Sequence, residues 1–305
     1  MQVGDLEVLP VADGRLLAPW PDTYPEGPEV ADHQFATDDG RIILSVGGFL
    51  VRGGDRVVLI DAGGGPDVGP PSRWRDEVRL RDVLRSGGLD DDAVAHTLVA
   101  TGAMAAEHGT LPASLAALGV VPADVTDVVL THLHFDHIGW ASVGGAPFFP
   151  DATYRCARPD VEYFLGADGL DETFFGLVFG ATSAAERLAP VLDRLEPWDG
   201  DATLAPGIDG LLAPGHTPGS AVVVVSSGEH RALLLGDIVH CPLELTDDEF
   251  VFLGDVDPDL ARRTRDHYRR VMEDGDIAAA GAHFTDLQFG RLLPGRGRRG
   301  WQIES

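Results

Sequence analysis

Lysine is absent from this 305-residue sequence, so all 23 of its fixed cationic side chains are arginines, set against 49 acidic ones. The formal net charge is −26. Such an acidic chain repels phosphate backbones and anionic membranes, which excludes nucleic acid and membrane surfaces as expected partners. The absence of lysine also excludes Schiff-base chemistry and the phosphate-binding loop that needs a lysine.

Cysteine is scarce, and long hydrophobic runs are missing. Cys156 and Cys241 have no partner nearby in the sequence, which argues against a disulfide scaffold and a thiolate zinc site. Any metal must therefore be bound by nitrogen and oxygen. The sequence has no stretch of membrane-spanning length, and its start lacks the pattern of a signal peptide, so we expect a cytoplasmic protein. A hydrophobic fraction of 44% supports a single folded domain over residues 1–305.

Against this background one stretch stands out: T-H-L-H-F-D-H-I-G-W, residues 131–140. It follows the apolar run 127–130, which is typical of a buried strand. Because alternate residues of a strand share a face, His132 and His134 can point toward one ion. Asp136 and His137 follow the turn and can point toward a second. A solvated loop would explain any one of these residues, but the whole cluster favours a metal site.

Three more candidate ligands follow later predicted strands: His216 in a tight Pro/Gly turn, Asp237 after Leu235-Gly236, and His283 after a run of alanines. The complete set is five histidines and two aspartates, enough for two adjacent ions. Imidazole and carboxylate without thiolate suit zinc, with iron, manganese or cobalt as substitutes. Two such ions can share a hydroxide, lower its pKa and bind a reacting oxygen.

The order of predicted elements indicates the fold class. Hairpins are predicted over 41–61 and 222–235, and helices over 110–119, with Thr110 as its cap, and over 257–275. Strands precede helices in both halves, which predicts an α/β (α+β) protein of two packed sheets with helices outside. We expect residues 6–17 to form an edge strand.

Two segments are less regular. Residues 66–106 are expected to form an excursion over one face, either a lid, a solvated insertion or a contact in a homodimer. Phe174, Phe175 and Phe179 belong to an apolar segment that forms core or lines a substrate pocket.

Four motifs, taken together and in this order, resemble the metallo-β-lactamase superfamily of hydrolases. They are T-H-L-H-F-D-H, the turn Gly215-His216-Thr217-Pro218-Gly219, Gly236-Asp237 and Ala282-His283. The resemblance implies a four-layer αβ/βα sandwich with a dinuclear metal site along one edge. It assigns one metal to His132, His134 and His216, the other to Asp136, His137 and His283, and the bridge to Asp237. It also implies that Asp61, at the end of a predicted strand, holds a ligand histidine in its tautomer.

Within that superfamily, His134 stands where diiron flavoproteins carry glutamate, which disfavours a redox role. The segment G-D-I-V-H-C-P-L-E-L, with D-V-D-P and an arginine-rich helix after it, is similar to the branch of methyl parathion hydrolase-like enzymes and acyl-homoserine lactonases. Those lactonases carry a tyrosine three residues after the bridging aspartate, where this chain has His240. The difference favours the comparison with methyl parathion hydrolase.

The resulting expectation is a metal-dependent hydrolase of a small, fairly apolar, ester-like substrate, with a lactone as the first choice. A metal-bridging hydroxide attacks, Asp136 orients the nucleophile, and His240 hydrogen-bonds the oxyanion or leaving group. Phe135 and Trp140 flank the metal motif and are candidates for substrate contact or for core packing. The alternatives are a thioesterase, a β-lactam or organophosphate hydrolase, and a non-catalytic metal-binding protein.

Overall fold

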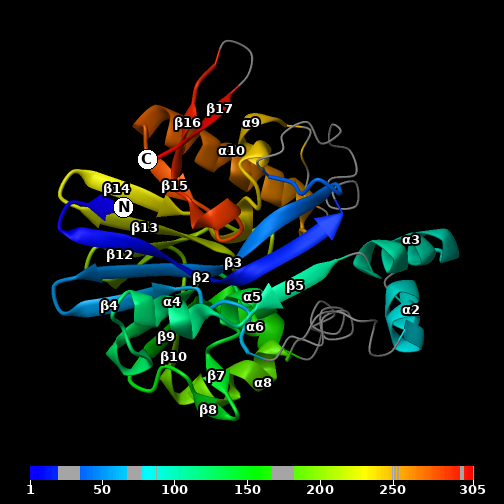
Figure 1. Cartoon of the computed structure of the whole chain (residues 1–305), viewed down its shortest axis with the longest axis horizontal. Helices are drawn as coiled ribbons and strands as arrows, with labels where there is room; N and C mark the ends of the chain where they lie inside the picture. Colours follow the sequence, from blue (N-terminus) through cyan, green and yellow to red (C-terminus); the bar gives the residue numbers. More distant parts are fainter. Residues whose placement is uncertain are drawn as a thin grey trace.

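Two large mixed sheets pack against each other with helices on the outside (Figure 1), as the sequence predicts. The computed structural model describes residues 1–19, 35–66, 77–86, 88–102, 104–166, 182–248, 250, 252, 254–295 and 299–304. One sheet has the order β1-β2-β3-β4-β6-β9-β10, with β5 beside β2, and the other has the order β11 to β17. The aromatic segment 174–179 lies outside the described residues.

The first sheet consists of β1 (Gln2–Val3), β2 (Leu6–Pro19), β3 (Arg41–Gly53), β4 (Arg56–Ile60), β5 (Ala105–His108), β6 (Asp127–Leu130), β9 (Thr153–Ala157) and β10 (Leu195–Trp198). The second consists of β11 (Ala202–Ala205), β12 (Ile208–Leu212), β13 (Ala221–Ser227), β14 (His230–Leu234), β15 (Ala278–Ala280), β16 (Gly290–Leu293) and β17 (Gly300–Ile303). A small hairpin pairs β7 (Ser142–Val143) with β8 (Ala146–Pro147).

The described helices are α2 (Glu77–Ser86), α3 (Asp91–Gly102), α4 (Leu111–Ala117), α5 (Phe135–Ile138), α6 (Arg158–Leu165), α8 (Ala184–Leu188), α9 (Leu243–Thr246) and α10 (Pro258–Gly275). The described residues also form four short 3-10 helices, η1 (Pro122–Asp124), η2 (Ala189–Arg194), η3 (Gly236–Ile238) and η4 (Thr285–Leu287). Among the described residues, no helix combines the length and apolar character that crossing a membrane requires.

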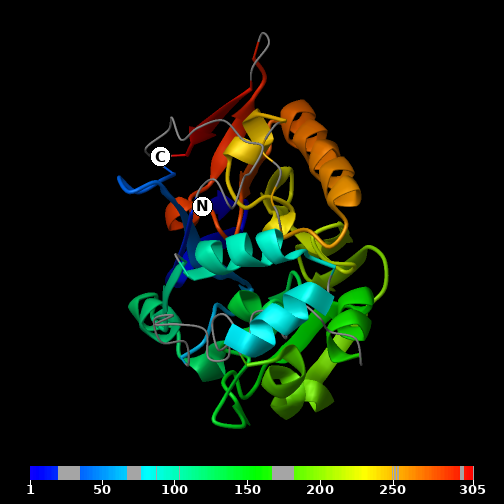
Figure 2. The ribbon, with the colours of Figure 1, turned by 90° about the vertical axis from the view of Figure 1, so that its right-hand side faces the viewer.

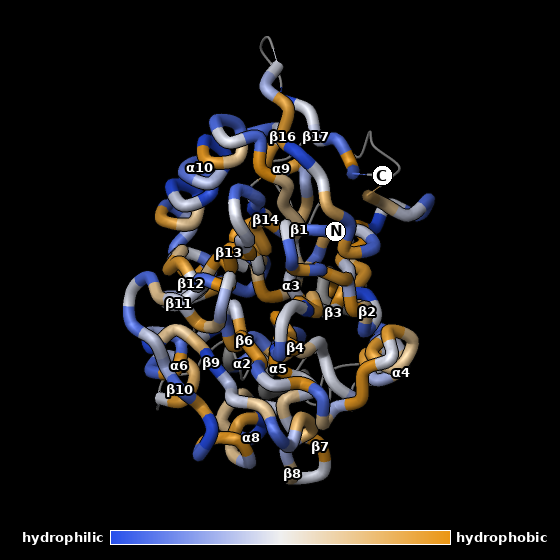
Figure 3. Tube along the Cα trace, turned by 90° about the vertical axis from the view of Figure 1, so that its left-hand side faces the viewer, coloured by the Kyte–Doolittle hydropathy of each residue, from blue (hydrophilic) through white to orange (hydrophobic). Residues whose placement is uncertain are grey.

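Hydrophobic strands in the centre of both sheets form the core. Figure 3 shows apolar segments concentrated in strands such as β3, β13 and β14, while the outer helix α10 alternates between polar and apolar turns. All four residues of β6 are buried, as expected for a strand covered on both faces. Because β4, β6 and β9 run parallel, their carboxyl ends meet at one edge of the first sheet. Strands β14 and β15 are also parallel and end together in the second sheet.

The prediction that residues 6–17 form an edge strand is wrong. β2 pairs with β3 along most of its length, and its other side pairs with β1 and β5. β5 comes from the end of the 66–106 segment, so a strand about ninety positions away in the sequence covers this edge. The helices α2 and α3 of the same segment lie at one end of the molecule, at the right of Figure 1, and face the viewer in Figure 2. A lid or a dimer contact formed by this segment stays a prediction.

Helix α4 forms where expected, but Thr110 does not cap it with its side chain. The Thr110 hydroxyl instead donates to the Asp13 carbonyl at 2.9 Å. The buried Asp13 carboxylate accepts the helix's first amide, from Leu111, at 2.7 Å, and it also accepts the Gly64 amide at 2.8 Å. One carboxylate from β2 therefore fixes both the start of α4 and the glycine loop that follows Asp61.

Candidate metal centre

All seven predicted ligands converge where the strand ends of the two sheets meet. They form two groups of side chains that could hold a metal ion: His132, His134, His216 and Asp237; and Asp136, His137 and His283. Within each group the ligand atoms lie within 4.8 Å of one another, and every one of these side chains is buried. Each group contains residues from both halves of the chain.

Three imidazoles converge in the first group. His134 Nδ1 lies 2.9 Å from His132 Nε2 and 3.0 Å from His216 Nε2. Asp237 Oδ2 lies 3.6 Å from His132 Nε2 and 3.5 Å from His216 Nε2. A cation among these atoms would meet three nitrogens and one oxygen, a donor set that suits zinc.

Asp237 also reaches the second group. Its Oδ1 lies 3.3 Å from His137 Nε2, and its Oδ2 lies 3.0 Å from His283 Nε2. Asp136 completes this group, with its Oδ2 at 3.6 Å from His283 Nε2 and its Oδ1 at 3.9 Å from His137 Nε2. Asp237 therefore lies between the two groups, where a carboxylate can share its oxygens between two ions.

Asp61 lies directly behind His137. The residue adopts a left-handed backbone conformation, with φ of 61°, and its carboxylate accepts hydrogen bonds from the Thr131 amide and hydroxyl, each at 2.8 Å. Its Oδ2 lies 3.0 Å from His137 Nδ1. A proton held on Nδ1 by this contact leaves Nε2 of His137 directed at the cluster, which is the arrangement that a metal ligand needs.

Two more ligand histidines have comparable contacts that the sequence did not reveal. His216 Nδ1 lies 3.1 Å from Asp255 Oδ1, and His283 Nδ1 lies 2.7 Å from the Ser45 carbonyl. Asp255 belongs to the D-V-D-P segment, so its carboxylate was visible in the sequence but its target was not. In each case Nδ1 is engaged and Nε2 faces the other ligands.

Asp160, in the first turn of α6, links the segment of His132 and His134 to the turn of His216. The sequence did not reveal this role. Its buried carboxylate accepts hydrogen bonds from the Leu133 amide at 3.2 Å and the Thr217 hydroxyl at 2.9 Å. It also accepts the Gly219 amide at 2.5 Å. Burial raises the pKa of this carboxyl group to about 6, although the three hydrogen bonds act in the opposite direction. Because Leu133 lies between His132 and His134, and Thr217 follows His216, these hydrogen bonds help to hold all three histidines in place.

The electrostatics of the cluster fit a cation. Burial holds the pKa of His132 and that of His216 well below the usual value, so both imidazoles keep the lone pair that a metal ligand needs. Burial would also lower the pKa of His137, but the carboxylates of Asp237 and Asp61 outweigh it and raise that pKa well above its usual value. Within the described part of the chain, His137 Nε2 and Asp237 Oδ1 make no hydrogen bond. The site therefore offers neutral imidazoles and a negative charge from buried carboxylates, and a divalent ion needs both.

His240 lies beside this cluster and is buried. Its Nε2 is 3.5 Å from Asp237 Oδ2, and its Nδ1 is 3.6 Å from Glu244 Oε1. Burial alone would lower its pKa, but these two carboxylates raise it to about 10. The ring stacks on Phe252, with centroids 3.5 Å apart. The carboxylates of Asp237 and Glu244 therefore favour the protonated form of His240.

The two aromatic candidates differ in their surroundings. Trp140 belongs to the main hydrophobic core and packs on Phe148, with ring centroids 4.8 Å apart. Phe135, at the start of α5, is 8% exposed and lies between two ligands in the sequence.

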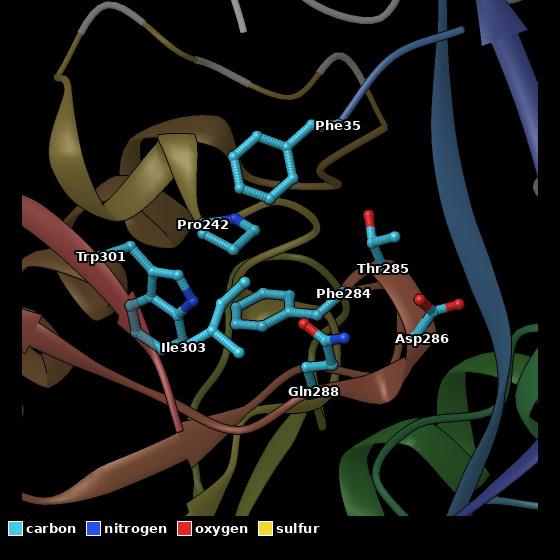
Figure 4. A pocket seen from close by; sticks show the side chains of 8 residues that line it. All are labelled: Phe35, Pro242, Phe284, Thr285, Asp286, Gln288, Trp301 and Ile303. Atoms are coloured by element: carbon cyan, nitrogen blue, oxygen red, sulfur yellow. The ribbon is translucent and has the colours of Figure 1, made fainter. Parts of the chain in front are cut away.

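A pocket of about 200 Å³ lies beside the segments that carry two site histidines (Figure 4). Pro242 follows His240 by two positions, and Phe284 follows His283 directly. The pocket is lined by Phe35, Pro242, Phe284, Thr285, Asp286, Gln288, Trp301 and Ile303. Its walls therefore combine aromatic surface with a carboxylate and an amide.

Comparison with known proteins gives the same family as the motifs. The sequence profile of the Metallo-beta-lactamase superfamily matches residues 48–283. A probable metallo-hydrolase of Mycobacterium tuberculosis is 29% identical over 266 residues, covering 78% of this chain and 74% of the relative. The N-acyl homoserine lactonase AttM of Agrobacterium fabrum is 34% identical over 127 residues, covering 39% of this chain and 43% of the lactonase.

Solved structures share the fold. The dizinc quorum-quenching lactonase AidC superposes with a TM-score of 0.78 at 22% identity, covering 100% of this chain and 96% of AidC. The hydrolase AbOPH of the beta lactamase superfamily superposes with a TM-score of 0.76 at 21% identity, covering 100% of this chain and 96% of that chain. The family profile, the fold and the clustered ligands agree, and the chain belongs to the metallo-beta-lactamase superfamily, as a hydrolase.

Proposed function

We propose that the chain is a dinuclear metal-dependent hydrolase of a small ester-like substrate, with a lactone as the first candidate. The observation that supports this most is the position of Asp237, whose carboxylate lies within 3.6 Å of ligand nitrogens from both groups. His132, His134 and His216 would hold one ion and Asp136, His137 and His283 the other, with Asp237 shared. Zinc suits this set best, with iron, manganese or cobalt as substitutes.

When bound, the two cations would lower the pKa of water into the neutral range and polarise the carbonyl oxygen of the substrate. The protein contributes orientation and proton donation. Asp136, whose carboxylate lies near both His137 and His283, would orient the attacking nucleophile. His240, whose protonated form the carboxylates of Asp237 and Glu244 favour, would donate a hydrogen bond to the developing oxyanion or to the leaving oxygen. Phe135 remains our candidate for substrate contact, whereas the surroundings of Trp140 favour core packing.

Two observations bear on the substrate class. N-acyl homoserine lactonases recur among the similar sequences, which supports a lactone. His240 replaces the tyrosine of those lactonases, and a protonated imidazole can also stabilise charge on a phosphoryl oxygen. An organophosphate hydrolase is therefore the second candidate. A thioesterase of an anionic thiol carrier is disfavoured, because the lysine-free chain offers only arginines to bind such a carrier.

The proposal is tested by metal analysis together with a substrate panel. We expect about two zinc ions per chain after zinc loading, and hydrolysis of N-hexanoyl homoserine lactone in preference to an acyl thioester, a β-lactam and a phosphotriester. Less than one bound metal per chain in a folded, carefully prepared sample would refute the dinuclear site. Preference for the phosphotriester would instead favour the second candidate.

Replacing the shared ligand gives the matching mutational test. Asp237→Ala should lower turnover of the best substrate by about 100-fold or more, because one carboxylate serves both groups. Asp259→Ala removes an exposed carboxylate at the start of α10 and serves as the control, with unchanged turnover. Circular dichroism would show that both variants fold. Full activity of the folded Asp237→Ala variant would contradict the bridging role and exclude a catalytic dinuclear centre.

We also propose a cytoplasmic location, which is supported by two buried cysteines that form no disulfide.

A further inference from the structure

We infer that Arg265 is a positioning residue for the metal centre, because it links the carboxylates that lie behind His216 and His240. The inference rests on the proposed function, since it concerns the same site. It assigns a role to a residue of α10 that is not one of the seven predicted ligands and that contacts Ile238, Glu244 and Asp255.

Arg265 is buried, with 2% exposure, and its guanidinium lies between three parts of the chain. Its Nε donates to the Ile238 carbonyl at 3.0 Å. One terminal nitrogen lies 3.2 Å from Glu244 Oε2 and 3.6 Å from Asp255 Oδ2. Ile238 directly follows Asp237, so the first contact fixes the backbone of the shared ligand.

The carboxylates of Glu244 and Asp255, which Arg265 contacts, also contact histidines of the site. Asp255 uses its other oxygen, Oδ1, to contact His216 Nδ1 at 3.1 Å. Glu244 uses Oε1 to accept the backbone amides of His240 and Cys241, at 3.1 and 3.2 Å. The same oxygen lies 3.6 Å from His240 Nδ1. One guanidinium therefore lies behind a proposed metal ligand, a proposed proton donor and the shared aspartate.

The charges explain why a cation is needed at this position. Glu244 and Asp255 are both buried, and two buried carboxylates near a single point repel each other unless a positive charge lies between them. Without the guanidinium the pair would separate or bind a proton, and either change would move the imidazoles that they contact. Lysine would keep the charge, but it lacks the planar group that can reach a carbonyl and two carboxylates at once.

Arg269, one turn further along α10, shows what a purely structural arginine does here. It is also buried, but it contacts the Glu244 carbonyl and the side chains of Asp248, which is largely exposed, and Asp266, which is partly exposed. None of these three groups touches a ligand histidine in the contacts of the described residues. Arg269 therefore anchors α9 to α10, whereas Arg265 contacts two carboxylates that in turn contact His216 and His240.

The test compares Arg265→Met and Arg265→Lys with a matched control, Arg155→Met. Arg155 pairs with the buried Asp127, which begins β6 at the end of that strand opposite His132. The control thus removes an arginine from a buried ion pair at a distance from the metal centre. Zinc affinity is measured by competition with a chromophoric chelator, the free energy of unfolding by urea titration, and kcat and KM with N-hexanoyl homoserine lactone.

We expect Arg265→Met to lower zinc affinity by about 10- to 100-fold, as loss of a contact behind a ligand commonly does. Arg265→Lys should fall between Arg265→Met and the wild type, and kcat should decrease in both variants more than KM changes. Arg155→Met should lose stability and keep wild-type zinc affinity. Two further variants separate the effect through Asp255 from the effect through Glu244. Asp255→Asn should weaken zinc binding, and Glu244→Gln should lower kcat with zinc retained.

Wild-type zinc affinity in Arg265→Met and Arg265→Lys would overturn the inference and leave Arg265 a structural residue like Arg155. If Arg265→Met does not fold, Arg265→Lys and Asp255→Asn decide the question by the same zinc measurement. A wild-type chain that binds no zinc would refute the proposed function instead, so the two failures are distinguishable.

Discussion

At the scale of single residues, the sequence predicts that the seven candidate ligands converge and that Asp61 contacts a histidine among them, but not the other contacts behind these histidines. His132 to His137 are adjacent in the chain, and a strand followed by a turn restricts where their side chains can point. Asp160 lies 57 positions from Thr217, which donates to its carboxylate. Such a contact depends on how α6 packs against the Pro/Gly turn, so no local sequence pattern predicts it. Asp255 and Glu244 lie in the segments D-V-D-P and G-D-I-V-H-C-P-L-E-L, but the sequence does not show which groups they contact.

Asp160 gives a pH prediction at this scale. Its pKa is raised from 3.8 to about 6 in the folded protein, so between these values the folded state keeps a proton that the unfolded chain has released. The contribution of this group to the free energy of unfolding is therefore largest below pH 4 and decreases as the pH rises toward 6. Asp160→Asn, which cannot ionise, should show a flatter pH dependence than the wild type in this range.

Urea titrations at half-unit steps of pH, performed on both proteins, measure this difference. The comparison removes contributions from other groups, such as Asp255, that both proteins share. A wild-type curve and a variant curve that run parallel from pH 4 to pH 6 would show that Asp160 is ionised in the fold with an ordinary pKa.

At the scale of elements, the sequence predicts those that depend on local signals. The β3–β4 hairpin turns at Gly54, whose φ of +62° suits glycine, and α4 ends before Gly119, with φ of +72°. The two errors came from distant partners. β2 is covered by β5, and Thr110 turns its hydroxyl to Asp13 because that carboxylate already accepts the first amide of α4. In both cases tertiary contacts override a local preference.

The close packing at the end of α5 gives a testable prediction at the scale of elements. Gly139 packs so tightly on the loop after Asp61 that an added Cβ would lie 1.9 Å from the Gly64 carbonyl carbon. Because backbone opposes backbone, Gly139→Ala must move α5 away from the loop and draw His137 away from Asp61. We expect a loss of about 1–3 kcal/mol in stability together with weaker zinc binding.

The matched control is Gly300→Ala in β17, where an added Cβ has no heavy atom within 4 Å. Thermal unfolding and chelator competition on both variants check the prediction. Equal stability and equal zinc affinity for the two variants would mean that α5 and the Asp61 loop can separate without cost to the site.

At the scale of the whole molecule, the seven candidate ligands come from both halves of the chain. The first group takes His132 and His134 from the loop after β6 and His216 from the second half. The second group adds His283, which follows β15, to Asp136 and His137 of α5. The sequence predicts this convergence, because every candidate ligand follows a strand and strand ends meet at the edge of a two-sheet sandwich. It does not predict the contacts from α10 that lie behind the ligands, since one helix faces many positions.

Because ligands from both halves meet only in the folded state, bound metal should stabilise the whole protein. A ligand that binds the folded state alone adds about 4 kcal/mol when its free concentration is a thousand times the dissociation constant. Removal of metal by EDTA should therefore lower the midpoint of thermal unfolding by on the order of 10 °C, and added zinc should restore it. In Asp237→Ala, which has lost the shared ligand, the EDTA-induced shift should be smaller. A zinc-loaded wild-type sample that unfolds at the same temperature with and without EDTA would show that the ligands do not hold the two halves together through a metal.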